Sequence, residues 1–435
     1  MRRKIYQELL QWKQRSGESA LLVQGARRVG KSYIVEAFAK AEYKSYILID
    51  FNLVDQPVKE MFEHDLVDLK TFFMKLTTYY GVKLYERESL IIFDEVQLFP
   101  RARSAIKYLV ADGRYDYIET GSLISIRENV KDILIPSEED HVDMYPLDFE
   151  EFLWANGNDT MMDFIRDCYR KKAPLGQALH RKAMDLFRQY LIVGGMPQAV
   201  NAFVKHNDFD EVDRVKRRIL NLYRDDIRKH AKGYEMKVEA IYDEIPSQMK
   251  NQNQHFKLSS LKQGARFDEY KDAMFWLSDA MIVNHCYNAT EPTFGLNLNR
   301  DRTLLKCYMG DTGLLISHAF DENGIVTGEV YKKLLLDKLE VNMGMVMENM
   351  VAQMLTASGH KLYFYSNRSD ASSRMEIDFL IAKSQISNRH NISPIEVKSS
   401  KNYTLSSLKK FKTKYAEQLH IPYVLHTGDF KEEDS

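Results

Sequence analysis

The sequence lacks the features of a secreted or membrane-embedded protein. Three cysteines occur in 435 residues, far apart and odd in number, so no disulfide framework or zinc-ligand spacing is present. No run of eighteen apolar residues occurs, which argues against a membrane span. Residues 2–4 are basic, but no apolar segment follows them, so we expect no signal peptide. Together these absences predict a cytoplasmic protein without a membrane partner.

An excess of charge of one sign is also missing. The formal net charge is −1, with 61 basic and 62 acidic residues, so no overall field would attract nucleic acid. Any contact with nucleic acid must therefore come from local patches. Hydrophobic residues make up 44% and charged residues 28%, which is ordinary for a folded protein. At roughly 100–200 residues per domain, the length predicts two to four domains.

Short apolar runs alternate with helical patterns in the first 120 residues. The runs at 19–24, 46–51, 90–93 and 115–119 have the length and composition of buried strands. Strands that alternate with helices predict an α/β fold with a parallel sheet. The acidic stretch that follows, at 136–143, is expected to be a loop.

A phosphate-binding motif follows the first of these predicted strands. Residues 25–32, Gly-Ala-Arg-Arg-Val-Gly-Lys-Ser, match the pattern G-x-x-x-x-G-K-[ST] at every fixed position. In such a loop, backbone N–H groups and the next helix N-terminus surround phosphate oxygens. Lys31 is expected to reach the β- and γ-phosphates of ATP, and Ser32 to bind Mg²⁺. The predicted nucleotide-contacting residues of this segment are Gly25, Ala26, Arg27, Arg28, Val29, Gly30, Lys31, Ser32 and Tyr33.

An acidic pair completes the pattern expected for nucleotide hydrolysis. Asp94 and Glu95 follow four apolar residues, so they would emerge at the carboxyl end of a strand, where ligands bind in such sheets. Asp94 is expected to hold Mg²⁺, and Glu95 to orient the attacking water. Thr120 and Ser122 lie at the end of the next strand. Ser122 is either a sensor of the γ-phosphate or part of a simple turn.

Arginines near this motif allow two interpretations. Arg114 precedes the fourth predicted strand and is either an arginine finger for a neighbouring copy in a homo-oligomer or a solvated surface residue. Arg27 and Arg28 either touch phosphate or face solvent.

Further along the chain, additional segments join these motifs. They are residues 93–97, 119–122, 145–152, 190–197, 223–227, 311–314 and 395–399. With the phosphate-binding loop they resemble the prokaryotic AAA-type ATPases that carry a DUF4143 C-terminal region. The resemblance covers nearly the whole chain. One departure is Glu139, Asp140 and His141, which stand where many relatives have Gly-Arg, so an arginine function is not expected there.

The resemblance and the periodicity together predict four domains. They are a P-loop AAA-type core at 1–155, a helical lid at 156–235, a winged-helix-like segment at 236–290 and a nuclease-like DUF4143 domain at 291–435. Residues 194–197, Gly-Gly-Met-Pro, predict a sharp turn between helices of the lid. The winged-helix-like segment would either contact DNA or pack against other domains with a solvated basic face. Its candidate phosphate-binding residues are Lys257, Lys262, Arg266 and Lys271.

A second group of acids lies near the C-terminus. Glu396 and Lys398 are two apart in a predicted strand and project from one face, and Asp378 lies on another strand. With Glu348 on an apolar helix, they resemble the PD-(D/E)xK nuclease core, which implies a metal site. Such folds also survive as binding modules without activity. A basic helix that follows would hold a phosphate backbone through Lys409, Lys410, Lys412 and Lys414.

These observations predict an ATPase that uses ATP and Mg²⁺ and acts as a switch or motor on nucleic acid, with DNA as the expected partner. The alternative is a regulatory or scaffold protein with a degenerate nuclease-like domain and a protein partner. A small-molecule kinase is less favoured, because such kinases rarely need so large a C-terminal extension.

Overall fold

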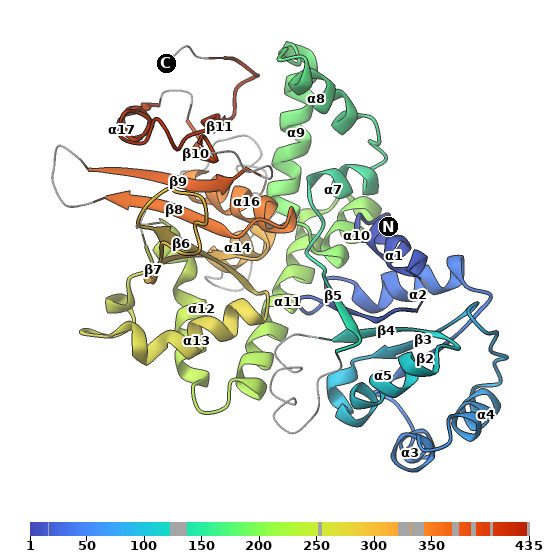
Figure 1. The fold of residues 1–435 in the computed structure, drawn as a ribbon. Helices are drawn as coiled ribbons and strands as arrows, with labels where there is room; N and C mark the ends of the chain where they lie inside the picture. Colours follow the sequence, from blue (N-terminus) through green and yellow to red (C-terminus); the bar gives the residue numbers. More distant parts are fainter. Residues whose placement is uncertain are drawn as a thin grey trace. The chain divides into compact units, whose positions relative to one another are not determined.

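The structure, a computed structural model, describes residues 1–15, 17–121, 137–250, 255–320, 331, 343–367, 374–383, 389–400 and 403–432. The chain divides into two units (Figure 1). The first contains Met1–Tyr145 with Asp279–Met281, and the second contains Pro146–Ser278 with Ile282–Ser435.

A parallel sheet of five strands forms the centre of the first unit. Its strand order is β2-β3-β4-β1-β5, so β4 lies between β1 and β3. The apolar faces of the strands pack against helices around an aromatic-rich core that includes Phe51, Phe62 and Phe93. The predicted P-loop α/β fold is therefore confirmed. The strands are β1 Ala20–Gln24, β2 Ser45–Asp50, β3 Ser89–Asp94, β4 Asp116–Gly121 and β5 Glu139–Asp143.

Seven helical segments accompany this sheet in the described residues. They are α1 Ile5–Gln14, α2 Lys31–Glu42, α3 Gln56–Glu60, the π-helical turn η1 Met61–Asp65, α4 Leu69–Tyr80, the 3₁₀ turn η2 Val96–Leu98 and α5 Pro100–Asp112. Proline at the first position of α5 is compatible with a helix start, because the N–H that it lacks has no partner there.

The loop predicted at 136–143 is wrong for residues 139–143, because these residues form β5, which pairs in parallel with β1 along its whole length. The acidic composition concealed the strand. At a sheet edge the backbone provides the pairing, while charged side chains are tolerated. Glu139 and Val142 are its buried residues, and Glu139 is neutralised there by Arg103 at 2.8 Å.

The second unit contains a mixed sheet of six strands in the order β11-β10-β9-β8-β6-β7. The pairs β6/β8 and β10/β11 are parallel, and the others are antiparallel, including the neighbouring strands β8 and β9 in Figure 1. Strands β7 and β11 had no counterpart in the sequence prediction. The bounds are β6 Val283–Ala289, β7 Arg300–Met309, β8 Leu362–Asn367, β9 Met375–Ala382, β10 Ile392–Lys398 and β11 Tyr423–His426.

Helices make up most of the rest of the second unit, as the sequence predicted for 147–250. Strand β6 falls within the segment predicted as winged-helix-like, yet it pairs with β7 and β8 in the six-stranded sheet. The predicted domain boundaries remain predictions. In the part of the chain that the structure describes, every helix is too short or too polar to cross a lipid bilayer. The helices are α7 Phe149–Ala155, α8 Met161–Arg170, α9 Gln177–Val193, α10 Pro197–His206, α11 Phe209–His230, α12 Glu235–Lys250, η3 Leu258–Ser260, α13 Phe267–Asp279, α14 Thr312–Ala319, α16 Met343–Ala357 and α17 Ser406–Lys414.

The glycine pair between α9 and α10 joins three segments of the second unit. The Gly195 N–H donates to Asp311 Oδ2 at 2.6 Å, and the Leu147 N–H donates to the Gly195 carbonyl at 2.7 Å. A Cβ added to Gly195 would lie 2.1 Å from the Leu147 carbonyl oxygen, and one added to Gly194 would lie 2.3 Å from Asp311 Oδ1. The turn predicted here is confirmed, and the close approach of these neighbours explains why both positions are glycine.

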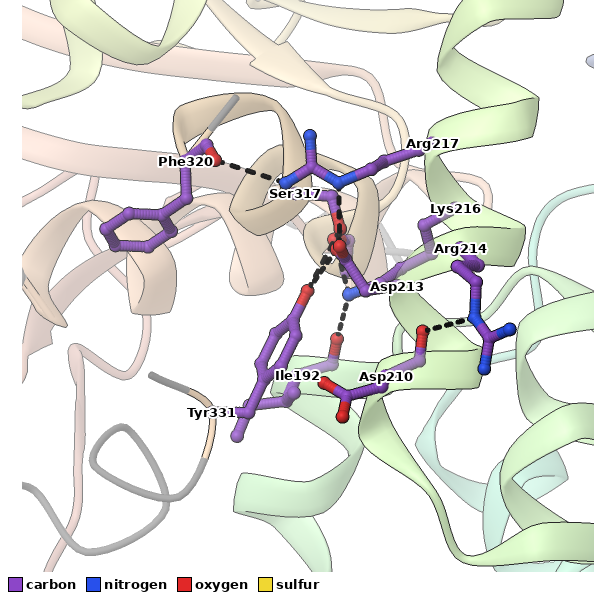
Figure 2. Close-up of polar contacts among 10 residues, drawn as sticks. Ile192, Asp210, Asp213, Arg214, Lys216, Arg217, Ser317, Phe320 and Tyr331 are labelled. Atoms are coloured by element: carbon purple, nitrogen blue, oxygen red, sulfur yellow. Dashed lines mark hydrogen bonds and ion pairs between the residues drawn. The ribbon is translucent and has the colours of Figure 1, made fainter. Parts of the chain in front are cut away.

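A buried polar network fastens α11 to its neighbours (Figure 2). Asp213 accepts hydrogen bonds from Ser317 at 2.7 Å, Tyr331 at 2.5 Å and Arg217 at 2.7 Å. One turn along, the fully buried Lys216 donates to the carbonyls of Ile192 at 2.7 Å and Gly313 at 3.2 Å. Because buried polar groups are costly without partners, this network determines how α9, α11 and α14 pack.

Candidate functional site

The phosphate-binding loop runs from the end of β1 to the start of α2. Gly30 has φ of 97°, a left-handed conformation that glycine adopts without strain, and α2 begins directly after it. Gly25 is required for another reason, since a Cβ there would lie 2.4 Å from the Met144 carbonyl oxygen. The Lys31 ammonium donates to the carbonyls of Gly25 at 2.9 Å and Ala26 at 3.1 Å. It therefore lies across the inside of the loop.

Oxygen atoms from three elements meet next to this loop. The Ser32 hydroxyl, on α2, donates to Asp94 Oδ1 at 2.7 Å. The Thr120 hydroxyl donates to the same carboxylate oxygen. Since β4 lies between β1 and β3, the end of β4 places Thr120 beside Asp94. The sequence analysis named Thr120 only as part of a motif. Its position beside Asp94 depends on the order of the strands in the sheet, which the sequence does not reveal.

Glu95 follows Asp94 in a strained backbone conformation. Its φ is 53°, which is uncommon outside glycine and is often found at functional sites. The Glu95 N–H donates to the Thr120 hydroxyl at 3.3 Å, and the Gln97 side-chain amide donates to Glu95 Oε2. Both Thr120 and Gln97 are buried, so they hold Glu95 in one orientation at the end of the sheet.

The predicted arginines, Tyr33 and Ser122 lie in different settings. Arg27 and Arg28 are exposed, and the Tyr33 side chain is 62% exposed. Ser122 lies outside the described residues. Arg114 is paired with Asp112 through contacts of 2.6 and 2.8 Å and lies over the Phe73 ring, an arrangement that gives no support to an arginine finger.

The departure from the family pattern at 139–141 forms an internal ion cluster. Glu139 contacts Arg103 at 2.8 Å and His141 at 3.0 Å. Although burial raises it, hydrogen bonds with His141, Glu119 and Arg103 lower the pKa of Glu139 to about 2. Complete burial, together with Glu139, raises the pKa of Glu119 well above its ordinary value. The Arg103–Glu139 ion pair thus joins α5 to β5, and the fully buried Glu119 of β4 lies beside it with a raised pKa.

The C-terminal acids predicted to form a second site do come together. Glu348 on α16, Asp378 on β9 and the pair Glu396 and Lys398 on β10 influence one another electrostatically. Asp378 Oδ2 accepts the Val397 N–H at 2.8 Å, and the Lys398 ammonium pairs with Glu396. Burial first, and then the nearby Glu348 carboxylate, raise the pKa of Asp378 to about 7.

A lysine that the sequence reasoning missed lies within this acid cluster. Lys306 on β7 contacts Glu348 Oε1 at 2.9 Å and Glu376 Oε1 at 3.0 Å, and Tyr308 donates to the same Glu348 oxygen. Among the residues that the structure describes, no three or more His, Cys, Asp or Glu side chains are arranged to hold a metal ion. The metal role predicted for Glu348 therefore gains no support. The one feature of the sequence that could have identified Lys306 is its place inside an apolar run, but the strand that contains this run was not predicted.

Two basic surfaces match the candidates for nucleic-acid contact. On α17, Leu408 and Phe411 are buried, while the lysines lie on the exposed side of the helix. The four basic candidates between 257 and 271 are also exposed. The exposed lysines of α17 are Lys409, Lys410, Lys412 and Lys414.

Family models match three parts of the chain. An AAA domain matches residues 17–153, and DUF4143, a domain of unknown function, matches residues 343–435. The chain is an AAA-type ATPase with a DUF4143 C-terminal region. The predicted family and ATPase activity are thus confirmed. DUF8612, another domain of unknown function, matches residues 184–323 and was not predicted; it contains Lys306, whereas the other members of the acid cluster belong to DUF4143.

Several solved structures are similar to this chain at a distance. A Walker-type ATPase of Pyrococcus abyssi is 13% identical, with 73% of this chain and 95% of that chain covered and a TM-score of 0.43. Orc1 of Aeropyrum pernix in complex with DNA is 11% identical, with coverages of 75% and 94% and a TM-score of 0.28. RuvB of Thermotoga maritima, a Holliday junction branch migration motor, is 10% identical, with coverages of 65% and 89% and a TM-score of 0.29. TM-scores this low do not assign a function. No curated protein matches the chain.

Proposed function

We propose that this ATPase binds ATP and Mg²⁺ at the end of the five-stranded sheet through Lys31, Ser32, Asp94 and Glu95. The observation that supports this proposal is the meeting of the Ser32 hydroxyl and the Asp94 carboxylate, 2.7 Å apart, beside the phosphate-binding loop. Hydroxyl and carboxylate oxygens are the ligands that Mg²⁺ prefers, so the donor set fits the ion. Bound Mg²⁺ would neutralise negative charge on the phosphates.

Each protein group has a separate part in the proposed hydrolysis. The Lys31 ammonium now bonds to two neutral carbonyls, and phosphate oxygens would take their place with a stronger, charge-assisted hydrogen bond. Thr120 keeps Asp94 in position. Glu95, held by Gln97, accepts the proton of the attacking water, which needs a fixed carboxylate within hydrogen-bonding reach. The Glu95 N–H donates to the Thr120 hydroxyl, which itself donates to Asp94, so Thr120 couples the two acids.

The proposed output is a switch or motor that acts on nucleic acid and assembles as a homo-oligomer in the cytoplasm. The lysines exposed on α17 support the choice of nucleic acid, because four ammonium groups on one helix can follow a phosphate backbone. With a net charge of −1 overall, such binding depends on this local patch.

A regulatory or scaffold protein with a protein partner is the second candidate. Lys306 favours it, because an ammonium between Glu348 and Glu376 gives the DUF4143 region a neutralised cluster in place of an open metal site. Under this alternative ATP still controls the protein, but the C-terminal region binds a partner and cleaves nothing.

ATP hydrolysis measured with and without DNA separates these candidates. We expect DNA to stimulate hydrolysis, and the binding constant to fall steeply with salt concentration, since phosphate contacts release counterions. Replacing Lys409, Lys410 and Lys412 with glutamine should weaken binding and flatten the salt dependence. The control replaces Lys171, Lys172 and Lys182, exposed lysines of the same unit, and should leave both unchanged. No stimulation and a flat salt response would reject nucleic acid as the target.

A further inference from the structure

The acid cluster of the second unit contains its own counter-charges. The Lys306 side chain is 8% exposed, and its ammonium lies within 3.0 Å of one carboxylate oxygen of Glu348 and one of Glu376. Although burial alone would lower it, Glu348, Glu376 and Asp378 raise the pKa of Lys306 well above its ordinary value. The ammonium therefore stays charged, as a buried lysine does only when carboxylates surround it.

The other members of the cluster are also engaged within the protein. Lys398 pairs with Glu396, the Val397 N–H occupies Asp378 Oδ2, and Tyr308 donates to Glu348. One buried oxygen, Glu396 Oε1, has no hydrogen-bond partner among the described residues. Mg²⁺ and Mn²⁺ need several oxygen ligands, so a divalent ion here would have to displace the ammonium groups of Lys306 and Lys398 from these carboxylates.

This arrangement does not fit the metal site that the nuclease-like resemblance implies. That resemblance needs the carboxylates of Glu348, Asp378 and Glu396 to be available together. The structure instead directs Glu348 to Lys306 and Tyr308, and no group of three candidate ligands remains among the residues that it describes.

We propose that Lys306 is the resident cation of this cluster and excludes a divalent metal ion from it. Its ammonium supplies the positive charge that a metal would supply, and it joins β7 to α16 and β9 through Glu348 and Glu376. Lys306 thus connects the DUF8612 match to the DUF4143 match within one sheet. The cluster is a structural ion network, and the inference does not depend on ATP hydrolysis.

The test measures Mn²⁺ binding to the full, nucleotide-free chain. The electron paramagnetic resonance signal of free Mn²⁺ reports the binding. The wild type should bind no more Mn²⁺ than the double variant Asp378→Asn/Glu396→Gln. Lys306→Met keeps most of the length of the side chain but removes its charge, and so releases Glu348 from the ammonium. We expect this variant to gain one Mn²⁺ site at least about tenfold tighter than any wild-type site, because Glu348, Glu376 and Asp378 then lose the ammonium of Lys306, while Lys398 keeps its pair with Glu396.

Thermal unfolding provides a second readout. Mn²⁺ should raise the melting temperature of Lys306→Met by several degrees and leave that of the wild type unchanged, since a ligand that binds the folded state stabilises it. Lys409→Met, which removes an exposed lysine of α17, is the matched control and should behave as the wild type. If Lys306→Met does not fold, Lys306→Met/Glu376→Gln removes one acid together with the lysine and tests the same site.

Two results would overturn the proposal. One is a wild-type Mn²⁺ site that disappears in Asp378→Asn/Glu396→Gln. The other is a folded Lys306→Met protein, or its double variant, that gains no Mn²⁺ site. ATP hydrolysis by the same preparations shows separately whether the nucleotide site is intact, so a failure here is distinct from a failure of the proposed ATPase residues.

Discussion

The nucleotide site of the first unit and the acid cluster of the second both combine lysine with carboxylates, but their lysines have different partners. Lys31 donates to two neutral backbone carbonyls of the phosphate-binding loop. Lys306 contacts two carboxylates. Phosphate oxygens can replace the carbonyls around the first ammonium with charge-assisted hydrogen bonds, whereas the second ammonium already lies between two carboxylates. The same side chain therefore has a different chemical setting in the two units, a phosphate-binding loop in the first and a carboxylate cluster in the second.

Lys31→Ala tests the nucleotide site of this comparison and should have the largest effect of the variants considered. Without the ammonium, we expect ATP hydrolysis to fall at least about 100-fold, because a charge that stabilises the transferred phosphoryl group is lost. The measurement is steady-state ATPase activity with nucleotide binding by fluorescence. Lys40→Ala, on the exposed side of the same helix, is the control and should keep normal activity. Activity of Lys31→Ala within a few-fold of the wild type would reject the assignment.

Glu95→Gln distinguishes holding ATP from hydrolysing it. The amide cannot accept the proton of the attacking water, so hydrolysis should fall about 100-fold while ATP binding changes little. Binding and single-turnover hydrolysis are measured on the same protein. Glu88→Gln, at an exposed position just before β3, is the control. A large loss of ATP affinity in Glu95→Gln would show that Glu95 contributes to binding instead.

Gly195→Ala tests the packing of the second unit independently of nucleotide. The added methyl group would lie 2.1 Å from the Leu147 carbonyl oxygen, so the chain must shift. We expect the free energy of unfolding to fall by about 3–4 kcal/mol, as measured by urea denaturation. Gly176→Ala is the control, because nothing lies within 4 Å of the added atom there; its φ is positive at 83°, so the variant carries only the conformational cost. Its expected cost is about 1 kcal/mol. Equal losses in the two variants would contradict the steric explanation.

Lys216 sharpens the comparison of lysines, since it also donates to two carbonyls but is fully buried. Burial lowers the pKa of Lys216 to about 8 from an ordinary 10.5. Between these values the folded state has released a proton that the unfolded state keeps, so stability should rise with pH across this window. The expected gain is about 3 kcal/mol.

The measurement for Lys216 is urea denaturation at pH 7.5 and 10.5, and Lys216→Met supplies the reference. Subtracting the free energy of unfolding of the methionine variant removes the contribution of tyrosines and of other lysines that titrate in the same range. The difference between the two proteins should shift in favour of the wild type at high pH. A difference that does not change with pH would show that Lys216 keeps its proton in the folded state.

Local motifs explain why much of the first unit was predictable. The segment from β1 through α2, and the strand that ends at Asp94, depend on consecutive residues whose pattern is visible in the chain. Strand β5 was missed because an acidic edge strand is defined by backbone pairing with β1 and not by its own apolar residues. The contact between Thr120 and Asp94 was missed because it needs the strand order.

In the second unit, the individual elements were easier to predict than their partners. The chain carries Glu348, Asp378, Glu396 and Lys398 at positions where a helix and two strands were expected, and the structure has them there. Lys306 lies on β7, which had not been predicted, and it changes the chemical meaning of the other four. The charge state of a cluster is a property of all its members, so one missed residue is enough to alter the interpretation.

The sequence by itself determined the identity of the ATPase and the residues of its phosphate-binding loop, because loop geometry there depends on glycine, lysine and serine at short, fixed spacing. Only the tertiary structure decided that Thr120 shares Asp94 with Ser32, that Leu147 requires Gly195, and that Lys306 neutralises the C-terminal acids. These contacts join residues far apart in the chain. Their energies arise from burial and charge at a single point in space, which neither composition nor local spacing encodes.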